Sequence, residues 1–357
     1  MEAPQENIAP ESEPKKKRGK VILGIIGVIV ALALIAGAAI AVYMGGLSEA
    51  LSYKGNADEL ANALADSEEN GSFYVLVIGV DKEEGRSDVM VLTRVDVKNS
   101  IITMVSVPRD TPYLIDGSTA KLNKVYADQG EVACIEAVSQ LTGVPISHYV
   151  KVGFDQLKEV VDNMGGVEVN VPYSFKYYIP GRGSFFMEEG MNFLDGDQAL
   201  CLARNRKSYD YNGITQDAIR QANIRAIMMA LFKQVMSKPV LEIPDQVQAI
   251  AEMLETDIPV TDLVMWASEL AGNHQITVYS CTGPTEGDLD PETNLWLVDE
   301  APEQWAKIMT EVKAGRDPSK AMERTETADG AVKVGSSDII EVGTEESSDA
   351  IEEDAEE

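Results

Sequence analysis

The chain has 357 residues and a formal net charge of −29 at pH 7, with 59 acidic side chains against 30 basic ones. This balance argues against nonspecific nucleic-acid binding, which needs an excess of Lys and Arg to neutralise phosphates. With only three cysteines, far apart, and two histidines, neither a complete disulfide framework nor a Cys/His zinc site is expected. Any bound metal should therefore be a hard cation held by carboxylates.

The amino-terminal segment predicts a membrane anchor. Residues 21–44 contain no charged side chain, and as a helix rising about 1.5 Å per residue they would span a hydrocarbon core of about 30 Å. Basic residues, among them Lys15 and Arg18, directly precede this run. They predict a single-pass cell-membrane protein with residues 1–20 in the cytoplasm and the rest extracellular. The competing interpretation is a cleaved signal peptide, whose apolar core needs only about 7–15 residues.

The remainder of the chain divides into three parts. Residues 45–71 predict a juxtamembrane linker with some helical character, and residues 72–314 predict one folded domain. Residues 315–357 are rich in Glu, Asp, Ser and Thr and poor in aromatic side chains. Because such a composition buries too little apolar area to offset the entropy of ordering, we expect a disordered acidic tail.

Hydrophobic periodicity within the domain predicts alternating strands and helices. Apolar or alternating runs predict strands at 73–79, 89–97, 101–107, 148–152, 167–171 and 275–281. Helical periodicity predicts helices at 131–141, 154–164, 214–235, 241–254 and 260–270. Residues 173–191 are aromatic and glycine-rich and are expected to form a loop. The pattern indicates an α/β domain with a central mixed β-sheet flanked by helices.

The most informative stretch is Arg204-Asn205-Arg206. Two guanidiniums two residues apart fall on one side of an extended segment, where they would repel each other without an anion between them. Planar guanidinium forks suit bidentate contacts to oxyanions, which favours phosphate as that anion. The segment therefore predicts a phosphate-binding site.

A second group of charged residues lies upstream, at the ends of the first three predicted strands. Asp81 follows the first strand and Arg109 the third, while Arg86 and Asp88 stand two apart at the start of the second and can project to one side. Ligands gather beyond the carboxyl ends of strands in open α/β sheets, and Asp81 and Asp88 could share a Mg²⁺ ion. Alternatively, Arg86–Asp88 and Arg109–Asp110 are surface ion pairs, worth only about 0–1 kcal/mol each.

Several short motifs follow one another in a specific order. They are residues 106–111 (Ser-Val-Pro-Arg-Asp-Thr), 121–123 (Lys-Leu-Asn), 126–127, 141–144, 148–149, 161–172 and 194–200, followed by 204–206. In this order they resemble the LytR-CpsA-Psr family of membrane-anchored, extracytoplasmic enzymes of Gram-positive cell walls. The resemblance is strong over residues 70–235 and looser over residues 236–312.

The resemblance implies transfer of a glycopolymer phosphate from an undecaprenyl-pyrophosphate carrier to a peptidoglycan sugar hydroxyl, in teichoic acid or capsule assembly. It implies that Asp81 and Asp88 bind Mg²⁺. The residues that it implies for catalysis are Asp88, Arg109, Arg204 and Arg206. The residues that it implies for pyrophosphate binding are Arg86, Arg109, Arg204, Arg206, Arg220 and Gln221. The chain departs from the family pattern at Lys82, Gly153 and Asp217, the last standing where members usually carry an arginine.

The residues also fit this chemistry without the resemblance, because phosphoryl transfer mainly needs positioning and stabilisation of charge by cations. Asp88 or Asp81 could accept the proton of the incoming hydroxyl. Two other functions stay open: a non-catalytic protein that binds polyprenyl phosphate or wall polymer, and a transcriptional attenuator. The predicted topology disfavours an attenuator, because it leaves only residues 1–20 on the side of the DNA.

Overall fold

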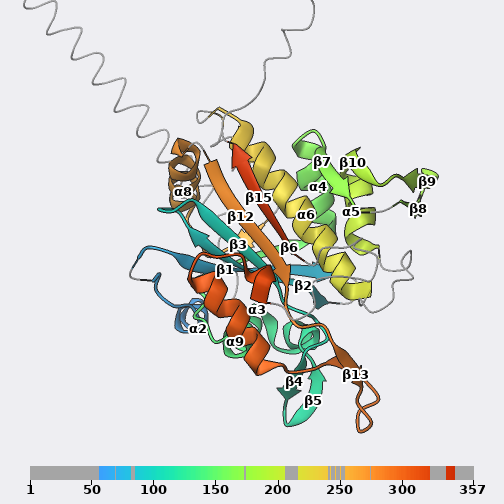
Figure 1. Ribbon diagram of the computed structural model, residues 1–357. Helices are drawn as coiled ribbons and strands as arrows, with labels where there is room; N and C mark the ends of the chain where they lie inside the picture. Colours follow the sequence, from blue (N-terminus) through green and yellow to red (C-terminus); the bar gives the residue numbers. More distant parts are fainter. Residues whose placement is uncertain are drawn as a thin grey trace, which may run out of the picture. The chain divides into compact units, whose positions relative to one another are not determined.

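Figure 1 shows the computed structural model of the chain. The residues that it describes are 56–68, 70–81, 85–172, 174–205, 216–239, 242, 246, 250, 254–273, 275–321 and 335–341. In this part of the chain no helix is both long and apolar enough to cross a bilayer. The predicted anchor at 21–44, the basic tail, Lys82 and most of the predicted helix at 241–254 lie outside the described residues.

A seven-stranded mixed sheet forms the centre, with the strand order β11-β6-β1-β2-β3-β12-β15. Its strands are β1 (Phe73–Asp81), β2 (Arg86–Asp96), β3 (Ile101–Ser106), β6 (His148–Gly153), β11 (Glu255–Thr256), β12 (Gln275–Thr282) and β15 (Gly335–Glu341). β2 runs antiparallel to both β1 and β3, whereas β6 pairs parallel with β1 and β12 parallel with β3. The carboxyl ends of β1, β3, β6 and β12 therefore meet at one edge, where β2 begins.

Helices cover both faces of the sheet, as Figure 1 shows. One face carries α4 (Phe154–Asn163), α5 (Gly196–Arg204), α6 (Gln216–Ser237) and α8 (Val260–Gly272). The other carries α2 (Ala57–Ala63), α3 (Asn123–Thr142) and α9 (Pro302–Lys313). Along β1, Phe73 and Val75 pack towards the first group and Tyr74 and Leu76 towards the second. Burial on both faces explains the continuous apolar run, and the predicted α/β architecture is confirmed.

In the described part of the chain, four two-stranded ribbons flank this core. They are β4 (Pro112–Ile115) with β5 (Ser118–Lys121), β7 (Val167–Val171) with β10 (Gly190–Leu194), β8 (Phe175–Ile179) with β9 (Gly183–Met187), and β13 (Gly287–Leu289) with β14 (Trp296–Val298). The prediction of a loop at 173–191 is therefore wrong. Phe175, Ile179 and Met187 are buried, and these anchors let a short hairpin form in a glycine-rich segment.

The structure moves both predicted boundaries of the domain. The helix α2 confirms the helical character predicted within residues 45–71, and its buried Leu60 packs onto the domain, which therefore begins before residue 72. In the segment predicted to be a disordered tail, residues 335–341 form β15, which pairs antiparallel with β12. Ile340 is buried in the core on the face of the sheet that carries α4, α5, α6 and α8. Backbone pairing and burial of one isoleucine, worth about 1.5–3 kcal/mol, order this stretch despite its acidic surroundings.

Candidate functional site

A β-bulge positions Asp88 at the edge of the sheet. Gly79 pairs with Val89 and Val80 with Ser87, so Asp88 has no residue opposite it in the ladder. Such a bulge re-aims side chains and interrupts their alternation. Gly79 permits the close approach, because a Cβ at this position would lie 2.7 Å from the Cβ of Val89.

The bulge also interrupts the alternation on which the expectation that Arg86 and Asp88 share one side of β2 rested. The structure buries Asp88, whereas Arg86 is exposed and lies opposite Asp81 in the register. Two-residue spacing places side chains together only in a regular strand. The arginines whose contacts with Asp88 are described, Arg109 and Arg220, come from elsewhere in the chain.

The loop after β3 presents Arg109. The Thr111 hydroxyl and backbone N–H both donate to the carbonyl of Pro108, at 2.7 and 3.2 Å. The backbone N–H of Asn123, the first residue of α3, donates to the carbonyl of Arg109 at 3.1 Å. Local turn bonds and the start of α3 together fix the backbone from which the guanidinium projects.

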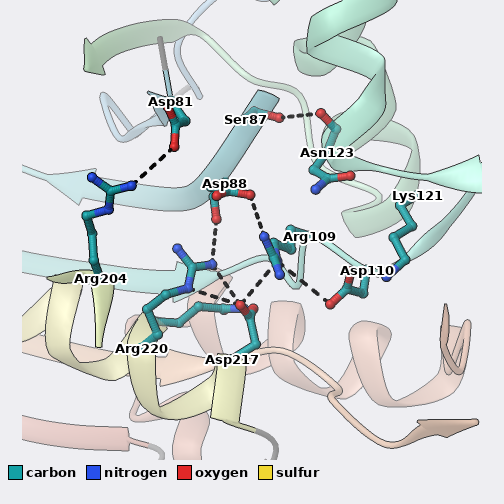
Figure 2. Close-up of polar contacts among 11 residues, drawn as sticks. Asp81, Ser87, Asp88, Arg109, Asp110, Lys121, Asn123, Arg204, Asp217 and Arg220 are labelled. Carbon is teal, nitrogen blue, oxygen red and sulfur yellow. Dashed lines mark hydrogen bonds and ion pairs between the residues drawn. The ribbon is translucent and has the colours of Figure 1, made fainter. Parts of the chain in front are cut away.

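Arg109 lies among three carboxylates (Figure 2). Its Nη1 donates to Asp88 Oδ1 at 2.6 Å, and its Nε lies 3.2 Å from Asp217 Oδ1 and 3.8 Å from Asp110 Oδ2. Asp110 also pairs with Lys121 at 2.7 Å. Burial by itself lowers the pKa of Arg109, but the Asp217 and Asp88 carboxylates outweigh burial and raise the pKa above its usual value. The guanidinium therefore stays charged.

The start of α6 completes this group. Asp217 Oδ1 lies 2.9 Å from Arg220 Nη2, and Asp217 Oδ2 accepts a hydrogen bond from Gln221 Nε2 at 2.7 Å. Arg220 Nη2 also donates to the backbone carbonyl of Asp88 at 2.7 Å, which ties α6 to the bulge. Burial raises the pKa of Asp217, but Arg220 and Arg109 outweigh it, so the pKa lies below its usual value.

Arg204 approaches the same edge from α5. A capping box between Asp195 and Gln198 fixes the start of this helix, and Arg204 is its last residue. Its Nη2 lies 3.7 Å from Asp81 Oδ2, and its guanidinium carbon lies 5.5 Å from the centre of the Phe154 ring. The side chain is 54% exposed, so it remains open to a ligand.

Most of the predicted site residues thus lie at one edge of the sheet (Figure 2). The structure brings together Asp81, Asp88, Arg109, Arg204, Arg220 and Gln221. Arg86 is exposed beside Asp81, and Arg206 lies outside the described residues. Sequence reasoning missed the bridging position of Asp217. Its spacing of three and four residues from Arg220 and Gln221 on a predicted helix was the available signal.

Asp81 and Asp88 provide a donor set that suits Mg²⁺ only in part. Among the residues that the structure describes, no group of three or more His, Cys, Asp or Glu side chains could hold a metal ion. Mg²⁺, however, usually keeps several waters and takes one or two carboxylates together with phosphates of the substrate. The two acids therefore fit a site that a phosphate ligand completes, and they do not form an all-protein cage.

Comparison with known proteins identifies the family. The model of the LytR_cpsA_psr family matches residues 41–313. The chain belongs to the LytR-CpsA-Psr family. The predicted resemblance is confirmed, and the match covers the described sheet and its helices except for η2 (Pro318–Ala321) and β15.

Similar proteins carry names that describe one activity. The chain is 31% identical over 226 residues to the polyisoprenyl-teichoic acid–peptidoglycan teichoic acid transferase TagV of Bacillus subtilis (strain 168), covering 60% of this chain and 56% of TagV. It is 30% identical over 269 residues to the transferase of the same description, TagU, of Bacillus licheniformis, covering 71% of this chain and 83% of TagU. The chain therefore spans little more than half the length of TagV.

Solved structures share the fold. The crystal structure of B. subtilis TagV matches with a TM-score of 0.59 and 27% sequence identity, over 70% of this chain and 98% of TagV in the crystal. A structure of TagT bound to LI-WTA matches with a TM-score of 0.56 and 20% identity, over 71% of this chain and 94% of TagT. At this identity the likeness to TagT concerns the fold alone.

Proposed function

We propose that this protein transfers a glycopolymer, with its phosphate, from an undecaprenyl-pyrophosphate carrier to a sugar hydroxyl of peptidoglycan. The observation that carries the proposal is the convergence of Arg109, Arg204 and Arg220 on the strand edge that also holds Asp81 and Asp88. Membership of a family whose similar members are named teichoic acid transferases supports the choice of polymer and acceptor. A teichoic acid is the favoured polymer.

In the proposed reaction, the acceptor hydroxyl oxygen forms a bond to the phosphorus that carries the polymer. The bond from that phosphorus to the bridging oxygen of the pyrophosphate breaks, and the carrier leaves as a polyprenyl monophosphate. The proton of the hydroxyl passes to a carboxylate at the edge, for which Asp81 and Asp88 are the candidates. Such transfer depends on in-line positioning and on cations that stabilise the developing charge.

The arginines would divide the remaining tasks by their exposure. Arg204 is half exposed, so it would bind an outer phosphate oxygen of the arriving lipid. Arg109 has a side chain that is 18% exposed and would contact the phosphate deeper in the site. Asp81 and Asp88 would hold Mg²⁺, which would supply charge neutralisation when bound. The predicted anchor at 21–44 would keep the domain beside its lipid substrate at the outer leaflet.

A transfer assay tests the proposal. The full-length chain in detergent is mixed with a lipid-pyrophosphate-linked teichoic acid and peptidoglycan oligomers, and polymer attached to peptidoglycan is quantified with Mg²⁺ and with EDTA. We expect Arg109→Ala to reduce the rate about 10²–10³-fold, the usual effect of removing one charge-stabilising donor. Arg204→Ala should also reduce it.

The matched control is Arg316→Ala. Arg316 is an exposed arginine paired with Glu311 at 2.6 and 2.9 Å just after α9, away from the edge. This variant should keep the wild-type rate. Wild-type transfer by the Arg109→Ala and Arg204→Ala variants, or polymer binding with no transfer by the intact protein, would contradict the proposal.

A further inference from the structure

The Asp217 carboxylate occupies the position of an anion inside the site. Both of its oxygens face cationic or amide donors: Oδ1 lies 3.2 Å from Arg109 Nε, 3.0 Å from Arg220 Nε and 2.9 Å from Arg220 Nη2. Oδ2 accepts from Gln221 Nε2 at 2.7 Å. Two guanidiniums and an amide around two oxygens form the kind of donor set that binds a phosphate.

The ion pairs that the structure describes around Asp217 are balanced in charge. They include Arg109, Lys121, Arg204 and Arg220 on the basic side and Asp81, Asp88, Asp110 and Asp217 on the acidic side. Within this set the formal charges cancel. Among these acids Asp217 contacts both Arg109 and Arg220 through its carboxylate, so it neutralises the part of the site most suited to phosphate.

Three buried polar atoms beside Asp217 have no hydrogen-bond partner within the described part of the chain: Arg109 Nε, Arg220 Nη1 and Gln221 Oε1. The Arg220 residue is 1% exposed, so Arg220 Nη1 cannot be satisfied by bulk water. A buried unsatisfied donor is costly, and a phosphate oxygen is the kind of acceptor that would satisfy it.

We infer that Asp217 is an internal competitor for the anionic ligand, and that its carboxylate sets how tightly this site binds phosphate. The ligand must displace or repel this carboxylate to reach the Nε edges of Arg109 and Arg220. The inference deepens the proposed function, because it takes from that function the identity of the ligand as a pyrophosphate. Arg220 and Arg109 outweigh the effect of burial, so the pKa of Asp217 is lowered and its carboxylate stays ionised at neutral pH.

A different role for Asp217 is stabilisation of α6. An acidic side chain in the first turn interacts favourably with the positive end of the helix macrodipole. The two roles differ in one measurable respect. If Asp217 only stabilises α6, neutralising it would leave the phosphate affinity unchanged or weaker. If Asp217 is a competitor, neutralising it would make phosphate bind more tightly.

Calorimetric titration of the full-length chain with inorganic pyrophosphate distinguishes them. Asp217→Asn keeps the shape of the side chain and removes its charge, and we expect it to bind pyrophosphate at least tenfold more tightly, a change of about 1.4 kcal/mol. Asp217→Ser, a second neutral variant that suits the start of a helix, should show the same direction. Asp217→Glu keeps the charge and should stay within about threefold of wild type.

The matched control is Asp128→Asn, which removes the same charge from an exposed pair with Lys124 at 2.8 Å. It should bind as wild type does. Folding of each variant is checked by circular dichroism and thermal melting. Equal or weaker binding by a folded Asp217→Asn or Asp217→Ser variant overturns this inference alone, whereas no pyrophosphate binding by any variant, wild type included, overturns the proposed function with it.

Discussion

The ion pair between Arg109 and Asp217 predicts a coupling free energy that a double-mutant cycle can measure. Arg109 Nε lies 3.2 Å from Asp217 Oδ1, and the two side chains are 18% and 16% exposed. Two unit charges at this separation attract by about 5 kcal/mol at an effective dielectric constant of about 20. Desolvation and lost side-chain entropy offset much of this attraction, so we expect a coupling of about 1–3 kcal/mol.

The single variants should differ in how far they lower the free energy of unfolding. Arg109→Ala leaves the Asp88 and Asp217 carboxylates with one cation fewer, which should lower the free energy of unfolding by about 3–5 kcal/mol, as for other broken buried pairs. Asp217→Asn retains a hydrogen-bonding side chain beside Arg220 and Gln221, so it should lower the free energy of unfolding by only about 1–2 kcal/mol. Arg109→Lys keeps the charge without the planar fork and should fall between wild type and Arg109→Ala.

Urea unfolding of the full-length chain, followed by tryptophan fluorescence, provides the assay, because Trp305 is buried in the core. The exposed pair of Lys124 and Asp128 serves as control, and its coupling should be about 0.3–0.5 kcal/mol. A coupling between Arg109 and Asp217 no larger than the control would refute the reasoning. So would an Asp217→Asn variant more stable than wild type.

Three further predictions follow from burial and close packing. The folded-state pKa of Asp217 is lowered, so its contribution to stability should be complete above the unfolded pKa of about 3.9 and lost as pH falls through the folded pKa. We expect the difference in free energy of unfolding between wild type and Asp217→Asn, measured by urea unfolding from pH 7 to pH 3, to close only below about pH 4. Burial raises the pKa of Cys134 and Cys281 to about 12, so iodoacetamide at pH 8 should label the partly exposed Cys201 first in the native protein, and equal labelling of all three by mass spectrometry would contradict this. Gly79→Ala places a Cβ 2.7 Å from that of Val89, and should lower the free energy of unfolding by about 1–3 kcal/mol, whereas a neutral result would show that the bulge can move.

The central strands could be predicted because burial on both faces leaves a simple signature. The run at residues 73–79 is apolar throughout, and it became β1 with side chains in both cores. The helices α4, α6 and α8 were likewise predicted by their periodicity. The β8–β9 hairpin was missed because three buried anchors hold it in a segment whose composition is typical of a loop. The strand β15 was missed because it is held by pairing with β12, which lies far from it in the sequence and leaves no signal in the local composition.

The clustering of the candidate residues was predictable, and their individual contacts were less so. Charged residues at strand ends indicated one edge of the sheet, and Asp81, Asp88 and Arg109 lie there. The bulge at Asp88 depends on the register with β1, which no feature of β2 alone reveals. The contact of Asp217 with Arg109 joins α6 to the loop after β3, and only tertiary packing brings these segments together.

The pairing of β15 with β12 has a practical consequence for shortened versions of the protein. The family match ends at residue 313, so this residue is an obvious choice for the carboxyl terminus of a shortened protein without the predicted anchor. A chain that stopped there would lack β15, so seven residues of β12, from Gln275 to Cys281, would lose their antiparallel neighbour. The exposed amide and carbonyl groups of β12 would then offer a template for pairing with another molecule. We therefore expect versions that extend through residue 341 to remain monodisperse at concentrations where those ending at residue 313 self-associate.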